Sequence, residues 1–441
     1  MNMKKTTTLF SLAVVFVMAA ASLAQANTVY NMQQAVDQAL EANPTMLAAR
    51  HDMLGAEAGR KSARGSFLPS ASVSYGYTRY DHDQPTRDNP TRDQDVWSAS
   101  FNVHQDLFTG WRILSTYQRA QLSEENATAR VLNTELSLVN TVQENFLGLL
   151  KAREDVRSAK DSVTRLREQL KVTQAFYDVG LQPRLDVLQA EVDLAGAEDA
   201  LLTAENSVAT QIVRLNTLLG LAHDADVDYE GNLAYQPFTL TIEDALERAY
   251  KDRPDLIIAK RSVEIAVKDK SITDSAFYPQ VGADFDWSTY GDDPNASGDG
   301  YANTEYSEWT VGVRASWTFW QWGKTYYASE QAKQNVSSLL QSADNTRNEA
   351  TYSVKSYHLA IGNAKESIRV NKKAVEAAQE SYRMAVARYQ AQVGTNTDVL
   401  DAQSRLTYAE AALTAALANY EIALSRLFVS IGEKNTALTS R

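Results

Sequence analysis

The sequence predicts an α+β membrane protein with four short amphipathic strands per chain, very long helices and an internally duplicated plan. Three observations predict this fold class. The chain begins with an export signal, four segments alternate apolar with polar residues, and two proline-free segments of roughly 70 residues have helical periodicity. The same order of segments occurs twice along the 441 residues, which indicates a duplicated architecture.

The N-terminus predicts secretion. Lys4 and Lys5 precede a compact apolar stretch, and Ala24-Gln25-Ala26 supplies small residues where a signal peptidase cleaves. We therefore expect residues 1–26 to be a signal peptide and the mature chain to begin at Asn27. The apolar stretch is too short to favour an uncleaved membrane anchor.

Composition excludes several classes of protein. The chain has no cysteine, so neither a disulfide framework nor a thiolate metal site is possible. Loss of the two signal lysines takes the formal charge from −12 to about −14, which argues against binding nucleic acid. The mature chain has no apolar run of about 20 residues, so membrane entry requires strands.

The internal repeat is visible in matched motifs. Met32–Ala39 followed by Pro44 corresponds to Ile242–Ala249 followed by Pro254, at an offset of 210 residues. This correspondence predicts a first repeat over 27–222 and a second over 241–441. Residues 223–240 would join them as a linker with little regular structure, because they contain proline and several aspartates.

Each repeat contains one predicted pair of strands, at about 70–80 and 96–106, then at about 281–290 and 308–319. Alternation by itself also fits a half-buried strand of a soluble sheet. The placement of all seven tryptophans in or just after these segments favours a membrane, where aromatic residues gather at the lipid–water interfaces. The predicted aromatic girdle is Trp97, Trp287, Trp309, Trp317 and Trp320. Residues 81–95 and 291–308 are predicted to be polar outer-surface loops.

A long helix follows each strand pair, over about 110–179 and 323–391, and a return helix follows over about 186–218 and 398–429. Apolar residues recur every three or four positions, a period that fits any long coiled coil. At about 1.5 Å per residue, each long helix would extend on the order of 100 Å.

Four strands cannot close a membrane barrel, because an open edge in lipid leaves backbone groups unpaired. Several chains must therefore contribute strands to one barrel. Two copies would give eight strands with a nearly filled interior, and three would give twelve with room for a lumen. If the barrel serves as a duct, three copies are favoured, because only the larger barrel leaves a lumen.

The ordered motifs resemble the TolC family of outer-membrane efflux and secretion channels. They are Tyr177-Asp-Val-Gly-Leu181 with Asp186, Val393-Gly-Thr395 with Asp398-Val-Leu-Asp401, and Leu107-Phe-Thr-Gly-Trp111. The resemblance covers the mature chain and implies a homotrimer, with a twelve-stranded transmembrane β-barrel continuous with a twelve-helix periplasmic α-barrel. It implies no cofactor. The implied partners are outer-membrane lipid, a periplasmic adaptor protein, and an inner-membrane ABC or proton-driven transporter.

The resemblance also implies a periplasmic mouth at the two helix turns. The adaptor-docking tips would comprise Val179, Gly180, Leu181, Gln392, Gly394 and Thr395. A latch between Asp186 and Tyr389 is carried over from the family. The second turn departs from the first, since Gln392 is in register with Gly180 and the glycine comes two residues later. The sequence does not decide which residue makes that turn.

Asp398 and Asp401 are the candidate gate. They are three residues apart on a helix and share a face, so three chains would place six carboxylates around a narrow, cation-favouring mouth. The alternative is that Asp398 is an N-cap and that Asp401 interacts with the helix dipole. The first repeat has Gln189 in place of Asp401, so one return helix per chain would carry the double ring.

We therefore expect an outer-membrane exit duct with a large periplasmic part, serving a tripartite efflux pump or a type I secretion system. A soluble periplasmic coiled-coil adaptor or scaffold is the alternative, since it accounts for the helices but not for the tryptophan-rich strands. An enzyme is not indicated, because the five histidines are scattered and the chain has no nucleophile or phosphate-binding motif.

Overall fold

The structure is a computed structural model, which describes residues 28–81, 94–291, 293–296 and 306–435. The predicted signal peptide and most of the two predicted outer loops lie outside these residues. The chain forms two compact units. One comprises residues up to Ala48, Asn133–Arg253 and Glu349 onward, and the other comprises Ala49–Leu132 and Pro254–Asn348. The long helices pass from one unit into the other and are described within each.

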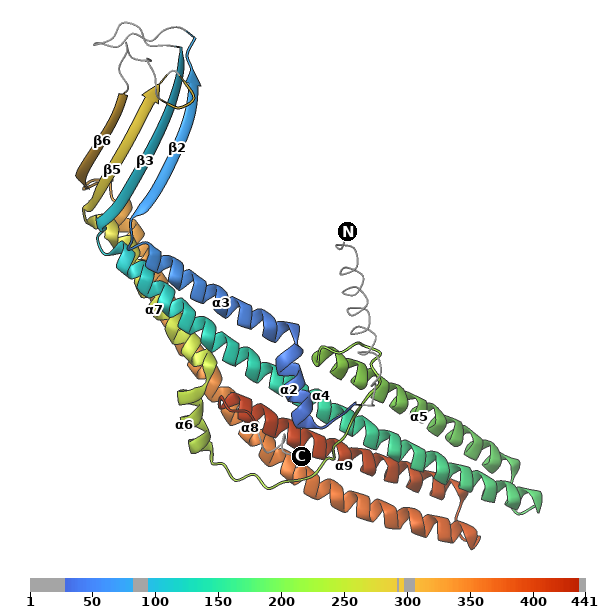
Figure 1. Cartoon of the computed structure of the whole chain (residues 1–441). Helices are drawn as coiled ribbons and strands as arrows, with labels where there is room; N and C mark the ends of the chain where they lie inside the picture. Colours follow the sequence, from blue (N-terminus) through green and yellow to red (C-terminus); the bar gives the residue numbers. More distant parts are fainter. Residues whose placement is uncertain (1–27, 82–93, 292, 297–305, 436–441) are drawn as a thin grey trace, which may run out of the picture. The chain divides into compact units, whose positions relative to one another are not determined.

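A four-stranded antiparallel sheet belongs to the second unit (Figure 1). Its strands are β2 (Ser70–Arg79), β3 (Asp95–Phe108), β5 (Gln280–Gly291) and β6 (Tyr306–Ser316), in the order β2-β3-β5-β6. β2 and β3 come from the first repeat and β5 and β6 from the second, so the two repeats meet at the β3–β5 pair. β6 ends before Trp317, earlier than the expected strand over 308–319.

The helices of this unit are α3 (Pro44–Gly65), α7 (Pro254–Asp274), and the first parts of α4 (Arg112–Asp178) and α8 (Lys324–Gln390). A single 3-10 turn, η2 (Ser275–Phe277), connects α7 to the sheet. Ion pairs link neighbouring helices, as in Arg119–Asp269 (3.2 Å) and Arg261–Glu125 (2.9 Å). These pairs are partly exposed, so packing contributes more to stability than they do.

In the other unit, α4 and α8 continue beside the return helices α5 (Arg184–Leu218) and α9 (Asn396–Ser430) (Figure 1). On α4 and α9, one face is buried at the three- and four-residue spacing expected of a coiled coil, whereas α5 and α8 have buried residues over only parts of their length. The short helices α2 (Met32–Ala42) and α6 (Ile242–Asp252) belong to the same unit, and α6 packs into a core with Val354 and Leu427. Both return helices begin two residues before the expected positions of 186 and 398.

The linker is more ordered than the sequence predicts. β1 (Thr28–Tyr30) pairs in parallel with β4 (Val227–Tyr229), which lies inside the predicted unstructured linker. Tyr229 is fully buried, and its hydroxyl donates to Asn216 at 2.7 Å. Strands of three residues carry too little periodicity to be recognised in a sequence, which is the physical reason for the difference.

Among the described residues, no helix has both the length and the apolar character needed to cross a membrane.

Candidate functional site

Four helices are joined by buried polar side chains near the two turns that connect α4 to α5 and α8 to α9. Asn396, at the start of α9, is only 1% exposed. Its amide oxygen accepts hydrogen bonds from Gln169 (2.8 Å) and Thr173 (3.3 Å) of α4. Its amide nitrogen donates to the backbone carbonyl of Asp186 in α5, at 3.1 Å. We call these residues, with Tyr389, the tip cluster.

Tyr389 completes the tip cluster from α8, because its buried hydroxyl donates to Thr173 Oγ1 at 3.1 Å. Its ring also contacts Phe176, with the centroids 5.5 Å apart. The latch between Asp186 and Tyr389 stays a prediction: both residues belong to the cluster, where hydrogen bonds through Thr173 and Asn396 connect them. Asp186 contributes its backbone carbonyl to the cluster. Burial raises the pKa of Tyr389, and the charge of the Asp186 carboxylate adds to that rise.

The two turns have the same backbone geometry. At the first, the Gly180 amide donates to Tyr177 O and the Leu181 amide to Phe176 O; at the second, the Gln392 amide donates to Tyr389 O and the Val393 amide to Arg388 O. Gly180 has φ +78° and Gln392 has φ +59°, so Gln392 makes the second turn in a conformation that favours glycine. At Gly394 the constraint is space, because a Cβ there would lie 3.1 Å from Arg388 Cβ.

Asp398 is not the N-cap of α9. Thr395 is the N-cap, and its hydroxyl accepts the Asp398 amide at 3.1 Å while the Asp398 carboxylate accepts the Thr395 amide at 2.9 Å. This reciprocal pair is a capping box. The hydrogen bond from the Thr395 amide holds the pKa of Asp398 below its usual value, and the Thr395 side chain and nearby Arg388 lower it further. Asp398 is therefore charged at neutral pH and remains exposed.

A groove of about 600 Å³ lies between α8 and α9 beside the second turn. Both candidate gate residues line it, together with Arg388, Arg405 and Met384. Asp401 is exposed, and it lies near Asp193 of α5. Partial desolvation raises the pKa of Asp193, and the negative charge of Asp401 adds to that rise. The predicted carboxylates thus lie on one open face of α9.

The predicted tip residues lie at the two turns, and their apolar members are exposed. Val179 and Leu181 are 69% and 52% exposed, and Val393 of the second turn is 66% exposed. Large apolar side chains at such exposure are typical of a surface that binds another molecule when they gather in a patch.

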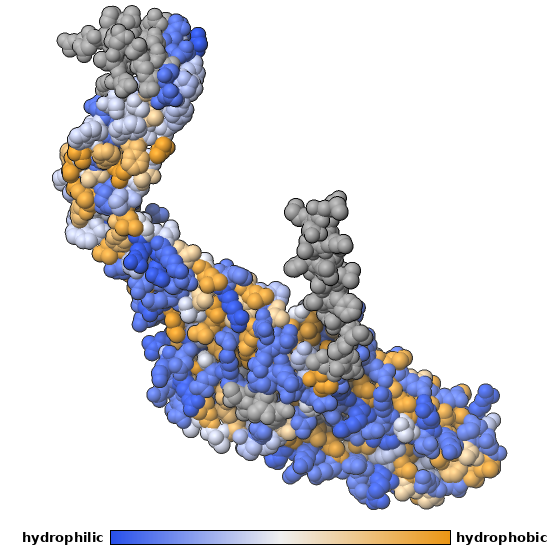
Figure 2. All heavy atoms as spheres, in the orientation of Figure 1, coloured by the Kyte–Doolittle hydropathy of each residue, from blue (hydrophilic) through white to orange (hydrophobic). Residues whose placement is uncertain are grey.

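One face of the sheet is apolar and exposed. Val73, Val311 and Val313 are each at least 70% exposed, and Figure 2 shows orange apolar residues over the strands. Of the predicted girdle residues, Trp97, Trp287 and Trp309 lie on strands, whereas Trp317 and Trp320 follow β6. Two further tryptophans, Trp111 and Trp322, have positive φ at equivalent strand-to-helix junctions of the two repeats.

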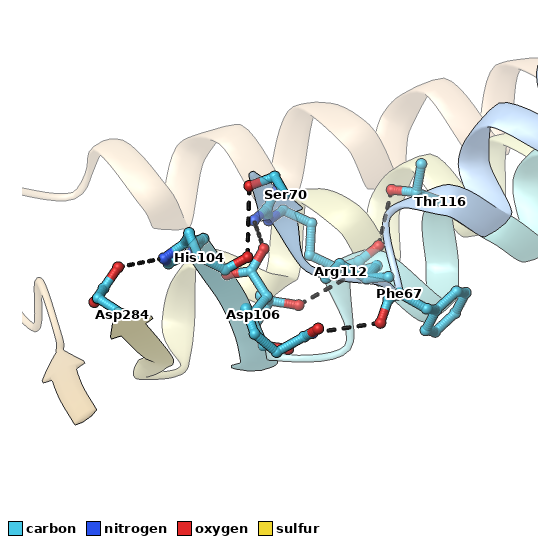
Figure 3. A network of polar contacts seen from close by, with 10 residues as sticks. Phe67, Ser70, His104, Asp106, Arg112, Thr116 and Asp284 are labelled. Carbon is cyan, nitrogen blue, oxygen red and sulfur yellow. Dashed lines mark hydrogen bonds and ion pairs between the residues drawn. The ribbon is translucent and has the colours of Figure 1, made fainter. Parts of the chain in front are cut away.

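The other face of the sheet is polar where the two repeats meet. His104 of β3 and Asp284 of β5 approach to 2.6 Å, and Asn102 contacts Asp286 two cross-strand pairs further along, on the same face. At the helical end, Ser70 donates to the His104 carbonyl and Gln105 to the Phe67 carbonyl, while Arg112 pairs loosely with Asp106 at 3.8 Å (Figure 3). A sheet with one apolar and one polar face suits strands between lipid and water.

A family model described as outer membrane efflux protein matches residues 35–221 and again 245–433, so each repeat matches it separately. The chain belongs to the outer membrane efflux protein family. The predicted family, the α+β fold class with its internal duplication, and the outer-membrane location are thereby confirmed.

Relatives of this family cover nearly the whole chain. Outer membrane protein TolC of Vibrio cholerae is 24% identical over 91% of this chain and 90% of its own length. The alkaline protease secretion protein AprF of Pseudomonas aeruginosa is 24% identical over 88% of this chain and 82% of its own. The crystal structure of VceC from Vibrio cholerae shares the fold, with a TM-score of 0.80 at 17% identity over 91% of this chain and 96% of that one.

As a member of this family, the chain is an outer-membrane exit duct that conducts passively and is not an enzyme. The soluble adaptor alternative is therefore not favoured.

Sequence reasoning missed Asn396, the centre of the tip cluster. The family resemblance places a basic latch partner near Gly394 or Asn396, and since neither is charged, the motif assigns the latch role to neither. A usable signal was present: Asn396, Gln403 and Glu410 are spaced by seven residues, so three polar side chains occupy one stripe of an otherwise alanine- and leucine-rich helix.

Proposed function

We propose that three copies of this chain form one duct that exports substrate for a tripartite efflux pump or a type I secretion system. The duct would receive its cargo through an adaptor protein bound at the two turns. The observation that carries the proposal is that the chain is incomplete alone: within the described residues its sheet has two open edges, and its return helix α5 is apolar on two opposite faces.

The sheet edges support the need for further copies. Within the described sheet, β2 and β6 each pair with one neighbour only, so each presents a row of backbone groups on its outer side. Such groups are costly in lipid, at several kcal/mol each, unless another strand pairs with them. Pairing β6 of one copy with β2 of the next satisfies both edges, and three copies would give twelve strands.

α5 supports the same arrangement. One face packs against its own chain through Val187, Ala190 and Leu215, which are at most 5% exposed. The opposite face carries a second apolar stripe, whose members are 45–71% exposed: Leu185, Leu188, Val192, Leu202 and Val213. A stripe at this spacing on a long helix is typical of a helix–helix interface.

The α8 side of the α8–α9 groove is a suitable receptor for that stripe on a second copy. Ala377 and Ala385 are among its lining residues, and small side chains let a neighbouring helix approach closely. Further along, α8 exposes Val370, Leu359 and Tyr352. Asp199 lies on the same face of α5 as this stripe, and its charge is opposite to that of Lys373 on α8. If the turns of the two copies lie at the same height, the two residues are at similar distances from the tip.

Cysteine crosslinking tests the assembly, because the chain contains no native cysteine. Full-length protein carrying Val192→Cys and Ala377→Cys should oxidise to covalent trimers as its largest product. Each single-cysteine variant is a control and should remain monomeric on a denaturing gel. Crosslinking that stops at dimers, or none at all, contradicts the proposed trimer.

Adaptor docking is supported by the exposed apolar residues at the turns and by the names of relatives. One is the toluene efflux pump outer membrane protein TtgC of Pseudomonas putida, and AprF is named for alkaline protease secretion. A photo-crosslinker attached to Gln392→Cys in intact cells should capture an adaptor protein. The same label at exposed Gln121→Cys on α4 is the matched control, and equal capture at both positions would contradict docking at the tip.

The gate assignment rests on Asp398 and Asp401, whose side chains share the open groove face. In the trimer, six carboxylates would surround the mouth. Replacing both residues with alanine should raise single-channel conductance in planar bilayers. Unchanged conductance would show that Asp398 serves only in the capping box of α9 and that the mouth is closed elsewhere.

A further inference from the structure

We infer that Gln403 and Glu410 are positioning residues for the gate: they hold α9 on α4 in one register and thereby direct the Asp398 and Asp401 carboxylates. This inference rests on the proposed gate. It concerns the α4–α9 interface beyond the tip cluster, where polar contacts between the two helices continue away from the turns.

The contacts form a row with a period of seven residues on α9. After Asn396, Gln403 donates to Ser162 Oγ at 3.2 Å, and Glu410 accepts from Ser158 at 3.0 Å and from Arg165 at 3.1 Å. Gln403 and Ser162 are 3% and 7% exposed, so the middle of the row is buried. We call Asn396, Gln403 and Glu410 the α9 polar row.

The partners on α4 also lie on one stripe, since they are three or four residues apart: Ser158, Ser162, Arg165, Gln169 and Thr173. Apolar residues on either side of this stripe complete the interface, among them Val163, Leu166 and Leu406, all buried. Buried apolar residues of this kind are what usually holds two helices of a coiled coil together. The presence of the polar row must therefore be explained by something other than the association of α4 with α9.

The row is not optimised for stability. Gln403 Oε1 and Arg165 Nε are buried, and neither has a hydrogen-bond partner among the described residues. Buried polar groups in coiled coils commonly lower stability while specifying one register, and apolar replacements of similar volume are often neutral or stabilising. Because the hydrogen bonding is incomplete and the spacing is regular, we infer that the row specifies the register of α9 on α4 and does not add to the stability of their contact.

Each member of the α9 polar row has a different kind of partner on α4, so a shift in register would place each side chain opposite an unsuitable partner. Asn396 meets an amide and a hydroxyl, Gln403 meets a hydroxyl, and Glu410 meets a guanidinium. The next position of the row is Leu417. A slip of one heptad would set Leu417 opposite Arg165 and separate the ion pair.

Register matters for the gate because the carboxylates lie on the opposite side of α9. At 100° per residue, Asp398 and Asp401 are displaced from Gln403 by about 140° and 160° around the helix axis. Any rotation of α9 on α4 that moves the polar row therefore turns both carboxylates by the same angle. The row fixes which way the gate residues face.

The test separates register from stability. Full-length Gln403→Leu with Ser162→Ala replaces the polar pair by apolar side chains, so we expect unchanged or higher thermal stability. We also expect higher single-channel conductance, spread over several levels, because α9 no longer has one register. Gln121→Leu, at an exposed position of α4, is the matched control and should behave as the unaltered protein.

A charge exchange gives a second arm. Arg165→Glu and Glu410→Arg should each raise conductance, and the double variant should restore the closed channel, since the ion pair re-forms with reversed sign. Closed channels in all Gln403 and Glu410 variants would overturn the inference. So would a conductance change that appears only with a fall in thermal stability.

The Asp398→Ala, Asp401→Ala double variant, measured in the same bilayers, distinguishes the two proposals. If it opens the channel while the polar-row variants do not, the gate stands and the positioning role is wrong. If neither opens the channel, the gate assignment itself fails, and the inference fails with it.

Discussion

The side-chain amide of Asn396 donates to the backbone carbonyl of Asp186 at 3.1 Å, which joins the first turns of α9 and α5, 210 residues apart in the sequence. Asn396 begins the return helix of the second repeat, and Asp186 lies in the first turn of the return helix of the first repeat. A single buried amide thus connects the two halves of the duplicated chain at the candidate mouth. Its other contacts, with Gln169 and Thr173, connect both return helices to α4.

Asn396→Ala should loosen the mouth. The change leaves Gln169 and Thr173 buried beside an unfilled site, and each unsatisfied polar group costs about 1–3 kcal/mol. We expect hydrogen exchange of the first turn of α9 to accelerate by roughly 5- to 100-fold, with single-channel conductance rising in parallel. Thr397→Ala, an exposed neighbour, is the control. Unchanged exchange in Asn396→Ala would mean that the cluster does not hold the turn.

Substitutions at the two turn residues, Gly180 and Gln392, should have opposite effects on the stability of their turns. Gly180→Ala forces a Cβ into a left-handed conformation at φ +78°, at a cost of about 1 kcal/mol. Gln392→Gly removes the same strain at φ +59° and should stabilise the second turn by a similar amount. Local hydrogen exchange at each turn measures both changes. Destabilisation by Gln392→Gly would show that its side chain makes contacts that outweigh the backbone strain.

Asp398 makes the second turn sensitive to acid. Its pKa is lowered by the Thr395 amide, so its stabilising contribution is complete at neutral pH and is lost as the pH falls through that lowered pKa. A spin label at Val393→Cys should therefore keep constant mobility from about pH 8 to 5 and become more mobile below about pH 4. Asp398→Asn should abolish this acid step, because its amide does not titrate. A step that persists in Asp398→Asn must belong to another group.

Glycine is required at one position of the sheet and not at another. A Cβ on Gly282 would lie 2.8 Å from the His104 ring, so Gly282→Ala should displace that ring from Asp284. Overpacking of this kind costs about 1–3 kcal/mol. A Cβ on Gly312 of β6 would meet no described atom within 4 Å, which makes Gly312→Ala the matched control. Heat-dependent gel migration should show a lower transition temperature for Gly282→Ala only.

The fold class and the family followed from the sequence because they depend on long-range periodicity and on order. Strand alternation over ten residues, proline-free helices and the 210-residue repeat each involve many positions, so no single residue decides them. The family model matches the two repeats separately, in agreement with that duplication. Strands of three residues, such as β1 and β4, were beyond this kind of reasoning.

The candidate mouth was only partly predictable. Asp186, Tyr389, Asp398 and Asp401 were identified by motif, and they lie close to the two turns. Their contacts were not predictable from the sequence. A hydrogen bond requires donor and acceptor to be placed to within an ångström, and this placement depends on how one helix is rotated against another. Thus Thr395 rather than Asp398 is the N-cap of α9, and the hydroxyl of Tyr389 donates to Thr173.

The sequence by itself determined the kind of protein, its export and the order of its elements, since these follow from composition and spacing. Tertiary structure decided which side of each helix faces which neighbour. Only packing could show that α5 retains an exposed apolar stripe, that Gln392 adopts positive φ, and that Asn396, Gln403 and Glu410 all meet α4. The physical reason is that a helical pattern defines faces but not partners, and burial is shared between segments far apart in the chain.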